Sequence, residues 1–554
     1  MSTAADTGGA PGSGARGLPI FTRKSTGLVR EVSLFDQLVF NATATSPLGT
    51  VLVFGLFALV LFPRANPYIA LVVALVLGVF VWTTFALLSA AIPRIGGDYT
   101  FNSRILHPVI GFAGNLCAFV SSAIAAGLWA WWLANQALSP AFGVIGDVTH
   151  TKTFQRWSAD LAGTPHNTTT FVTAIIALAI TSALALMGTR VIVRVMTALF
   201  LIATAAFVVD MLILLFTSHA SFKSHVDHAL GAGTYDKTVA KGHGAGIYPS
   251  EGGYSGKETI GAIYTMISVT LFTWWGTYLS AEFKGAGQRK RQLWSMVGAG
   301  LGQGLIVLFA MIVFLTTVGQ NFFTSALSGN FPGSGTIYTA GYAYFSALVA
   351  SNKLLVIILA LAFVGWWLPG LYINTAMCQR AIFTWSFDGL LPKRFGEVDE
   401  RTHTPVLAIL ISFAAAVGAA AWVSYTHNVS DFFKIFAVMQ LFAYIPVMLV
   451  GISALVMKWR RPDLYEGSPA QWKLAGVEVL PVAGLMCALV GAFSIGLIMY
   501  FHKNIGISGT YYTLMIVAPF VVLGVALVWW LVARSVRKSE GIDLALVYKA
   551  IPPD

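Results

Sequence analysis

The first long apolar stretch of the chain is interrupted in its middle, and this interruption constrains the fold strongly. Residues 35–62 are apolar enough to cross a bilayer, yet Pro47 and Gly49 lie near their centre. Pro47 lacks an N–H group and clashes with the carbonyl four residues back, and Gly49 adds backbone freedom. We expect a helix to run to about Thr43, open, and restart near Gly49. In lipid, an opened backbone persists only against protein or a water-filled cavity. Residues 43–50 therefore predict the wall of a central binding site, with a simple proline kink as the alternative.

The rest of the chain is equally apolar. It is 56% hydrophobic and 10% charged, whereas soluble domains carry roughly 25% charged residues. A transmembrane helix needs about 20 mostly apolar residues. Twelve runs meet this requirement: 35–62, 67–92, 109–138, 169–189, 191–217, 258–282, 294–318, 354–383, 405–426, 431–457, 479–501 and 511–533. The sequence predicts an all-α polytopic membrane protein with about 12 transmembrane helices.

The distribution of charge predicts the orientation. The net charge is +11, but the charged residues lie in short segments between apolar runs, so we expect no nucleic-acid partner. Most of the 34 Lys and Arg residues fall on the side of the N-terminus. The positive-inside rule then places both termini in the cytoplasm, as in a multi-pass protein of the cytoplasmic membrane.

No cofactor or metal is expected. The cysteines, Cys117, Cys378 and Cys487, all lie in apolar runs, and no Cys/His spacing suggests zinc. The connections 139–168 and 218–257 are rich in Gly, Ser, Thr and His, and we expect them to be outer loops. A metal site or pH sensor is one interpretation of their histidines, and solvated loop residues are the favoured one.

A second interruption is predicted in the sixth run. Around Thr270–Gly276, threonine, tryptophan and glycine replace smooth aliphatic residues. The first and sixth runs each lead a set of five helices, and the two sets begin with opposite orientations. Broken helices at matching positions are typical of inverted-repeat transporters, with the substrate site at the membrane midplane. The new helix N-termini would face an anionic group such as a carboxylate.

This pattern divides the chain into six parts. We expect an N-terminal cytoplasmic tail at 1–33, a first repeat at 34–217, an outer loop at 218–257, a second repeat at 258–458, two further helices at 459–534, and a cytoplasmic tail at 535–554.

Several short motifs occur in a recognisable order. The first group follows the second run: Pro93, Gly96, Gly97, Tyr99, Arg104, Pro108, Gly111 and Phe112. The later groups are Glu282, Phe283 and Lys284; Arg380, Asp388, Gly389, Leu390, Leu391 and Pro392; Arg401, Thr404 and Pro405; and Arg460, Arg461, Pro462 and Asp463. In this order and spacing, the chain resembles the amino acid–polyamine–organocation (APC) transporter superfamily.

The resemblance implies a five-plus-five inverted repeat with two further helices. It also implies a permease that moves amino acids or related amines by alternating access, often with H⁺ or by exchange. The substrate site would be formed by helices 1, 3, 6, 8 and 10. By position, the implied substrate-binding residues are Thr43, Ala44, Thr45, Ser46, Gly49, Thr50, Ser121, Ser122, Phe272, Thr273, Trp274 and Asn374. Trp274 or a nearby aromatic residue would close over the substrate.

Two departures from the family pattern matter. Many members have Gly-Ser-Gly in the helix 1 break, whereas here the triplet is Pro47, Leu48 and Gly49, which weakens recognition of a carboxylate. Some proton-coupled members have a lysine in helix 5, and its approximate equivalent here is Ala203. H⁺ and Na⁺ therefore both remain candidate coupling ions.

Three residues are candidates for gating or coupling. Asp210 lies inside an apolar run, where a charge costs roughly 2.5–3.5 kcal/mol. It would carry a proton or attract an amine, or else be an interfacial residue bonded to a neighbouring helix. Glu282 would be a gate residue or an ion-paired helix end, and Trp275 is the third candidate.

No nucleophile, metal or nucleotide motif indicates an enzyme. The glycine-rich segment 298–304 lies within an apolar run with no preceding strand, which favours a close-packing helix face. The expected partners are a small-molecule substrate and membrane lipid. The alternative function is a substrate-sensing membrane protein of the same fold that binds without transporting.

Overall fold

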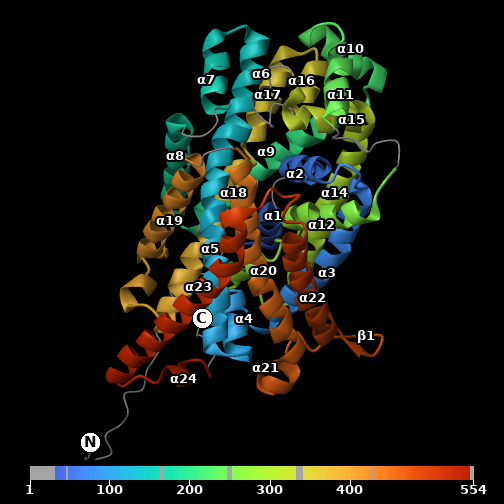
Figure 1. Ribbon diagram of the computed structural model, residues 1–554. Coiled ribbons are helices and arrows are strands. Elements are labelled where there is room, and N and C mark those ends of the chain that lie inside the picture. The colour runs from blue at the N-terminus through green and yellow to red at the C-terminus, as the bar shows by residue number, and fades with distance from the viewer. Residues whose placement is uncertain are drawn as a thin grey trace, which may run out of the picture.

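A computed structural model describes residues 32–44, 48–162, 167–245, 253–331, 341–425 and 429–549 of the chain (Figure 1). The structure is almost entirely helical. The first half contains α1 (Leu34–Ala44), α2 (Leu48–Leu61), α3 (Pro67–Ala91), α4 (Asp98–Ile105), α5 (Pro108–Trp132), η1 (Leu133–Leu138), α6 (Ser139–Thr149), α7 (Lys152–Ala162), α8 (Thr168–Leu186), α9 (Thr189–Leu215), α10 (His219–Leu230) and α11 (Thr234–Gly244).

The second half begins with the broken sixth run and ends near the C-terminus. It contains α12 (Gly256–Thr270), η2 (Trp275–Glu282), α13 (Arg289–Leu293), η3 (Trp294–Gly298), α14 (Ala299–Phe314), η4 (Leu315–Gly319), α15 (Gln320–Ser325), η5 (Ala326–Asn330), α16 (Tyr342–Val349), α17 (Lys353–Val364), α18 (Trp367–Phe387), η6 (Lys393–Gly396), α19 (Val406–Ser424), α20 (Val429–Arg460), α21 (Pro462–Tyr465), β1 (Lys473–Leu474), β2 (Val477–Glu478), α22 (Val479–Tyr500), α23 (Gly509–Ser539) and α24 (Leu544–Val547).

The membrane-spanning part agrees with the sequence prediction. Within the described residues, ten continuous helical segments are long and apolar enough to cross a membrane. Each coincides with one of the twelve predicted runs. The other two runs, 35–62 and 258–282, are the ones predicted to be broken, and each is divided into two shorter helices. The fold is therefore an all-α polytopic membrane protein.

The two connections predicted as outer loops are largely helical where the structure describes them. The helices α6, α7, α10, α11, α15 and α16 form a helical cap, which lies at the top of Figure 1. The third span runs without interruption from Pro108 to Thr149. Aromatic residues in these polar segments stabilise the cap, since the rings of Phe142 on α6 and Trp157 on α7 lie 5.5 Å apart.

The opposite end of the bundle, which we call the base, carries α4, α21, α24 and a small hairpin (Figure 1). In the hairpin, β1 pairs antiparallel with β2, with Lys473 opposite Glu478. The helix α5 packs against α4, α18, α19 and α20 and connects the base with the cap.

The glycine-rich segment of α14 is a packing face, as predicted. A Cβ atom at Gly304 would lie 2.2 Å from the side chain of Leu75 on α3, so a larger residue would force Leu75 to move.

Candidate functional site

The structure describes the first apolar run as two helices, which flank the break predicted from Pro47 and Gly49. The helix α1 ends at Ala44, and α2 begins at Leu48. Thr45 and Ser46 lie outside the described residues. Gly49 and Thr50 lie in the first turn of α2, so the restart of the helix is at the expected place.

The sixth span opens as well, between α12 and η2. Its last α-helical residue is Thr270, and a tight 3₁₀ segment follows from Trp275. Carbonyl groups near the end of a helix lack intrahelical partners. Here Trp82 Nε1 donates to the carbonyl of Leu271 at 2.8 Å, and Gln440 Nε2 donates to that of Ser268 at 3.2 Å. Buried side chains thus satisfy the opened backbone.

The two interrupted helices contact each other. Asn41 of α1 accepts a hydrogen bond from the backbone N–H of Gly276 at 2.9 Å and donates to the carbonyl of Ser295 at 2.9 Å. One turn earlier, Gln37 donates to Gln292 at 2.9 Å. The side chains of Gln37 and Asn41 are buried, so α1 is fixed to η2 and η3 by polar contacts deep in the bundle.

A small cavity lies beside these breaks. Its volume is about 40 Å³, and a cavity needs at least about 10–15 Å³ to hold one water. Its lining comes from α1, α5, α12, the residues between α12 and η2, η2 itself, α18 and α20. The lining residues are Ala44, Ser121, Ala125, Leu128, Trp129, Trp132, Ser268, Val269, Phe272, Trp275, Asn374, Phe436, Met439, Gln440 and Ala443. The site is nearly closed in this conformation.

The described lining residues are uncharged, and several are aromatic. A few of their polar atoms lack hydrogen-bond partners, which indicates a site for a ligand. Gln440 Oε1, Asn374 Oδ1 and Trp275 Nε1 are buried and have no hydrogen-bond partner among the described residues. A buried polar atom without a partner costs roughly 1–3 kcal/mol. The two amide oxygens are acceptors suited to an ammonium group, and the indole N–H is a donor suited to a carboxylate or hydroxyl.

Five of the residues singled out from the sequence line this cavity. They are Ala44, Ser121, Phe272, Trp275 and Asn374. The hydroxyl of Ser121 donates to the carbonyl of Met439 at 2.9 Å, which joins α5 to α20.

Four other predicted residues lie nearby without lining the cavity. Thr43 donates to the carbonyl of Val39, and Ser122 donates to the sulfur of Met377. Thr273 is buried, and its hydroxyl has no hydrogen-bond partner among the described residues. Trp274 stacks on Phe85, with ring centroids 4.2 Å apart. The aromatic side chains next to the cavity are Phe272 and Trp275.

The tenth helix, α20, was expected at the site, but the sequence singled out none of its residues. Phe436, Met439, Gln440 and Ala443 lie on one face of that helix and line the cavity. The run that contains them is long and unbroken, so its hydrophobicity pattern gave no reason to single out a face. Gln440 was the available signal, because a glutamine inside a membrane span is costly unless it is bonded or functional.

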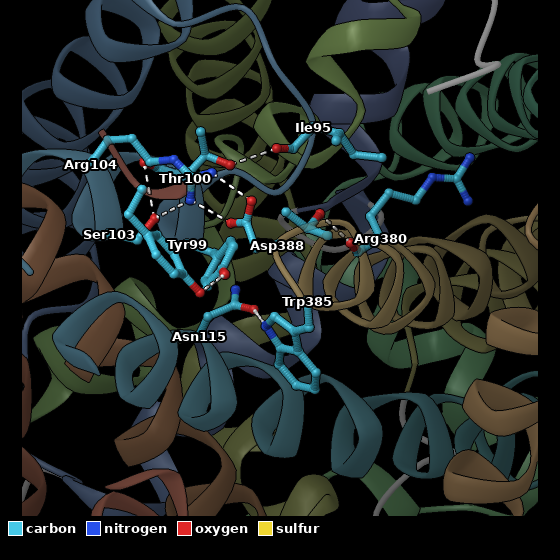
Figure 2. A network of polar contacts seen from close by, with 11 residues as sticks. Ile95, Tyr99, Thr100, Ser103, Arg104, Asn115, Arg380, Trp385 and Asp388 are labelled. Carbon is cyan, nitrogen blue, oxygen red and sulfur yellow. Dashed lines mark hydrogen bonds and ion pairs between the residues drawn. The ribbon is translucent and has the colours of Figure 1, made fainter. Parts of the chain in front are cut away.

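Towards the base, the cavity is followed by a buried polar cluster that we call the base latch: Asp98, Asn115, Tyr278 and Trp385. Tyr278 of η2 donates to the Asp98 carboxylate, and Asn115 of α5 donates to the same oxygen at 3.0 Å. Trp385 of α18 donates to Asn115 at 2.8 Å, as Figure 2 shows. The latch joins α4, α5, α18 and the broken sixth span.

The position of Asp98 perturbs its titration. Its helix α4 lies between the spans, and its side chain is fully buried. Burial raises the pKa of Asp98 to about 7, against the opposing effect of hydrogen bonds from Tyr278 and Asn115. No lysine or arginine among the described residues forms an ion pair with it. Asp98 therefore titrates near neutral pH.

Two buried ion pairs flank the latch. Arg104 of α4 bonds both carboxylate oxygens of Asp388, at 2.5 and 2.7 Å (Figure 2). Arg380 of α18 bonds Glu282 at the end of η2, with its closest N···O distance 2.9 Å. Each pair joins two motifs that are far apart in the sequence. The ion pair is the contact that one interpretation of Glu282 required, and it is also compatible with a gate residue.

Asp210 lies away from the cavity, towards the cap. It is buried in α9 and accepts a hydrogen bond from Ser346 of α16. This is the bond to a neighbouring helix that one interpretation of Asp210 required.

The architecture defines the class of protein. Two interrupted helices meet at a buried cavity inside a bundle of membrane-spanning helices, which is the arrangement of secondary transporters. A family model described as amino acid permease matches residues 38–533. The chain therefore belongs to the amino acid permease family, a family of amino acid transporters. The sequence has no match among curated proteins.

Proposed function

We propose that this permease transports neutral amino acids with apolar side chains by alternating access, coupled to protons. The observation that carries the substrate assignment is the lining of the cavity, whose described residues include several aromatic side chains and no charged one. A substrate with a charged side chain would place an unpaired charge in this site, which is strongly unfavourable.

The polar groups of the site suggest how the substrate is oriented. Gln440 Oε1 and Asn374 Oδ1 would accept hydrogen bonds from the ammonium group. The N-terminus of α2 would attract the carboxylate through its N–H groups and partial positive charge. Pro47 and Leu48 supply neither a hydroxyl nor an additional donor, so this interaction would depend on the backbone.

The small volume of the cavity indicates what must move. A space of about 40 Å³ is too small for an amino acid, so binding requires the lining side chains to separate. Phe272 and Trp275 belong to the broken sixth span, whose 3₁₀ segment also carries Tyr278 of the base latch. Movement of this span would open the site on one side and release the latch on the other. The positive-inside distribution of Lys and Arg supports a cytoplasmic location for the base.

Proton coupling is supported by two buried acids. Glu282 and Asp388 are ion-paired with arginine, whereas Asp98 and Asp210 form no ion pair among the described residues. A charged carboxylate accepts hydrogen bonds more strongly than a neutral one. Deprotonated Asp98 would therefore hold Tyr278 and keep the base closed, and protonation would weaken this contact. The other titratable groups near Asp98 are Cys117 of α5 and Tyr278.

Uptake by the purified protein in proteoliposomes tests the substrate class. We expect saturable uptake of leucine, phenylalanine or a related neutral amino acid, and at least tenfold less uptake of arginine and glutamate. Preferred uptake of a charged amino acid would contradict the proposed substrate class. Specific binding of a neutral amino acid without flux would instead favour the substrate-sensing alternative.

Imposed gradients test the coupling. We expect a proton gradient to drive accumulation, and a Na⁺ gradient alone to drive none. Asp98→Asn should abolish proton-driven accumulation while exchange of substrate across the membrane continues. Asp210→Asn is the parallel variant, and loss of proton dependence only in Asp210→Asn would move the coupling site to the cap.

A further inference from the structure

A basic cleft lies at the base of the bundle, on the other side of α4 from the cavity. Its volume is about 650 Å³. The turn between α4 and α5, the end of α20, the end of α23 and the residues around α24 form its walls. Arg460, Arg534 and Lys549 contribute side chains to it, and all three residues are exposed.

The positive charge of this cleft is only partly neutralised. Arg104 is bonded to Asp388, and Arg461 forms a two-pronged pair with Asp463, with distances from 2.7 to 3.2 Å. Among the described residues, no carboxylate forms an ion pair with Arg460, Arg534 or Lys549. Asp463 is the only acidic residue in the described lining. The cleft therefore has an excess of positive charge and favours an anion.

The cleft is also a built part of the fold. Arg461 donates to the carbonyl of Arg104 at 2.8 Å, which fixes the end of α20 to α4. The hydroxyl groups of Tyr548 and Tyr99 form a hydrogen bond at 2.9 Å. The Arg104 guanidinium lies 4.8 Å from the centre of the Tyr548 ring. The residues after α24 are thus held against α4, and the cleft has a fixed floor.

Apolar side chains of α23 lie beside the basic residues of the cleft. Trp530 of α23 lines the cleft, and the Arg534 guanidinium lies 5.3 Å from its ring centre. The neighbouring α23 residues Leu531 and Val532 are 50% and 57% exposed, as expected on a lipid-facing surface. Cationic and apolar groups side by side suit an amphiphile, with the anionic end among the arginines and the chain along α23. Guanidinium groups match phosphate oxygens in geometry and charge.

We propose that this cleft binds the phosphate headgroup of an anionic membrane lipid. Basic pockets between transmembrane helices are known to recognise such headgroups. The floor of the cleft is Arg104, and its helix α4 begins with Asp98 of the base latch. A bound headgroup would hold α4 in place and so favour the closed base. The lipid would therefore regulate the permease as well as surround it.

The test compares lipid binding by the full-length protein and by a variant that lacks two charges of the cleft. Native mass spectrometry would measure binding of phosphatidylglycerol and phosphatidylcholine to the wild type and to Arg460→Gln/Arg534→Gln. Each lost charge near a membrane surface weakens attraction of an anionic lipid about fivefold. We expect the double variant to bind phosphatidylglycerol more than tenfold more weakly and phosphatidylcholine unchanged.

The matched control is Lys393→Gln/Arg394→Gln. These two basic residues form part of η6 at the base and do not line the cleft. We expect this control to bind phosphatidylglycerol like the wild type. An equal loss in both double variants would overturn the proposal, because it would indicate attraction to a general basic surface.

Inorganic phosphate provides the second arm of the test. If the lipid occupies the cleft through headgroup and chain together, phosphatidylglycerol should raise the melting temperature of the wild type but not of Arg460→Gln/Arg534→Gln, and phosphate at the same concentration should have little effect. Equal stabilisation by phosphate would overturn the lipid assignment in favour of a free anion site.

Discussion

At the scale of residues, the cavity presents buried polar atoms without partners. Gln440 is the most informative of them. One end of its amide bonds the opened backbone of α12, and the other has no partner among the described residues. Gln440 also lines the cavity, which stabilisation of the helix break alone would not require.

Gln440→Leu tests this role. The substitution keeps a similar size but removes the acceptor, and a hydrogen bond to a charged group contributes roughly 1.5–3 kcal/mol. We expect the apparent affinity for a neutral amino acid to fall about tenfold or more in uptake assays. Gln303→Leu is the matched control, because Gln303 is buried in α14 but does not line the cavity. An equal fall in the two variants would argue that Gln440 acts through folding alone.

The pH dependence of stability tests the environment of Asp98. Its pKa is about 7 in the folded protein, against an ordinary value of 3.8. The folded state therefore binds this proton more tightly, so the contribution of Asp98 to stability is greatest below about pH 4 and falls as pH rises to about 7. The total change is on the order of 4 kcal/mol.

Asp98→Asn removes this titration. The difference in melting temperature between the variant and the wild type should shift in favour of the variant as pH rises from about 4 to about 7, and then stay constant. Thermal unfolding of the purified protein in detergent measures the two melting temperatures. A melting-temperature difference that stays the same across this pH range would contradict a buried, unpaired Asp98.

At the scale of elements, the proposed transport cycle depends on how closely α4 approaches the broken sixth span. Gly97 precedes α4 with a φ of +51°, and a Cβ atom there would lie 2.8 Å from Thr277 Oγ1. Glycine at this position therefore permits both the positive φ and the close approach to Thr277.

Gly97→Ala should disturb both the backbone conformation before α4 and the contact of α4 with η2. We expect a loss of stability of roughly 1–3 kcal/mol from backbone strain, together with loss of uptake as η2 is displaced from α4. Gly302→Ala is the control, because a Cβ atom there meets open space and alanine favours a helix. Uptake by Gly97→Ala at the wild-type rate would show that this contact does not affect the transport cycle.

The sequence predicted some elements better than others. Apolar length located the membrane-spanning runs, and Pro47, Gly49 and the aromatic cluster around Trp275 located both breaks. The cap helices were missed because short polar helices such as α7 lack a long apolar pattern and depend on contacts such as that between Phe142 and Trp157. A hydrophobicity pattern predicts which segments lie in lipid, and it does not predict packing between short polar helices.

For the site, the sequence predicted the segments that surround the cavity better than the individual side chains that line it. Phe272 and Asn374, which were predicted to bind the substrate, and Trp275, which was predicted to act in gating or coupling, line the cavity. Trp274, the other predicted aromatic residue, packs against Phe85. Phe272 and Trp274 lie in the turn between α12 and η2, and Trp275 begins the 3₁₀ segment. Neighbouring residues at such a break point in different directions, and only its geometry decides which one faces the cavity. The face of α20 could not be found, because a continuous helix gives no local signal of its neighbours.

At the scale of the whole molecule, buried ion pairs join distant parts of the chain at the base. Glu282 and Arg380 are each 2% exposed at their side chains. Breaking such a pair leaves one buried charge without compensation, at a cost of roughly 3–5 kcal/mol.

A double-mutant cycle tests this pair. Glu282→Gln and Arg380→Gln should each lower the melting temperature strongly, and the double variant should lose much less than the sum of the two. Lys223 and Asp236 in the cap form an exposed pair, and their cycle should show coupling of about 1 kcal/mol or less. Additive losses at Glu282 and Arg380 would contradict a strongly coupled pair.

The central claim is that the substrate occupies the cavity between the two helix breaks during transport. Ala44 lines that cavity, so Ala44→Cys places a thiol in the proposed path. The background would carry alanine in place of the three buried cysteines, Cys117, Cys378 and Cys487. Ala159→Cys, on an exposed position of α7, is the control for accessibility.

The measurement is the rate at which a small thiol reagent modifies each variant in proteoliposomes, with and without a transported neutral amino acid. The account predicts that the amino acid slows modification of Ala44→Cys severalfold, that arginine does not, and that Ala159→Cys reacts at the same rate throughout. Unchanged modification of Ala44→Cys at a concentration that saturates uptake would show that the substrate passes elsewhere.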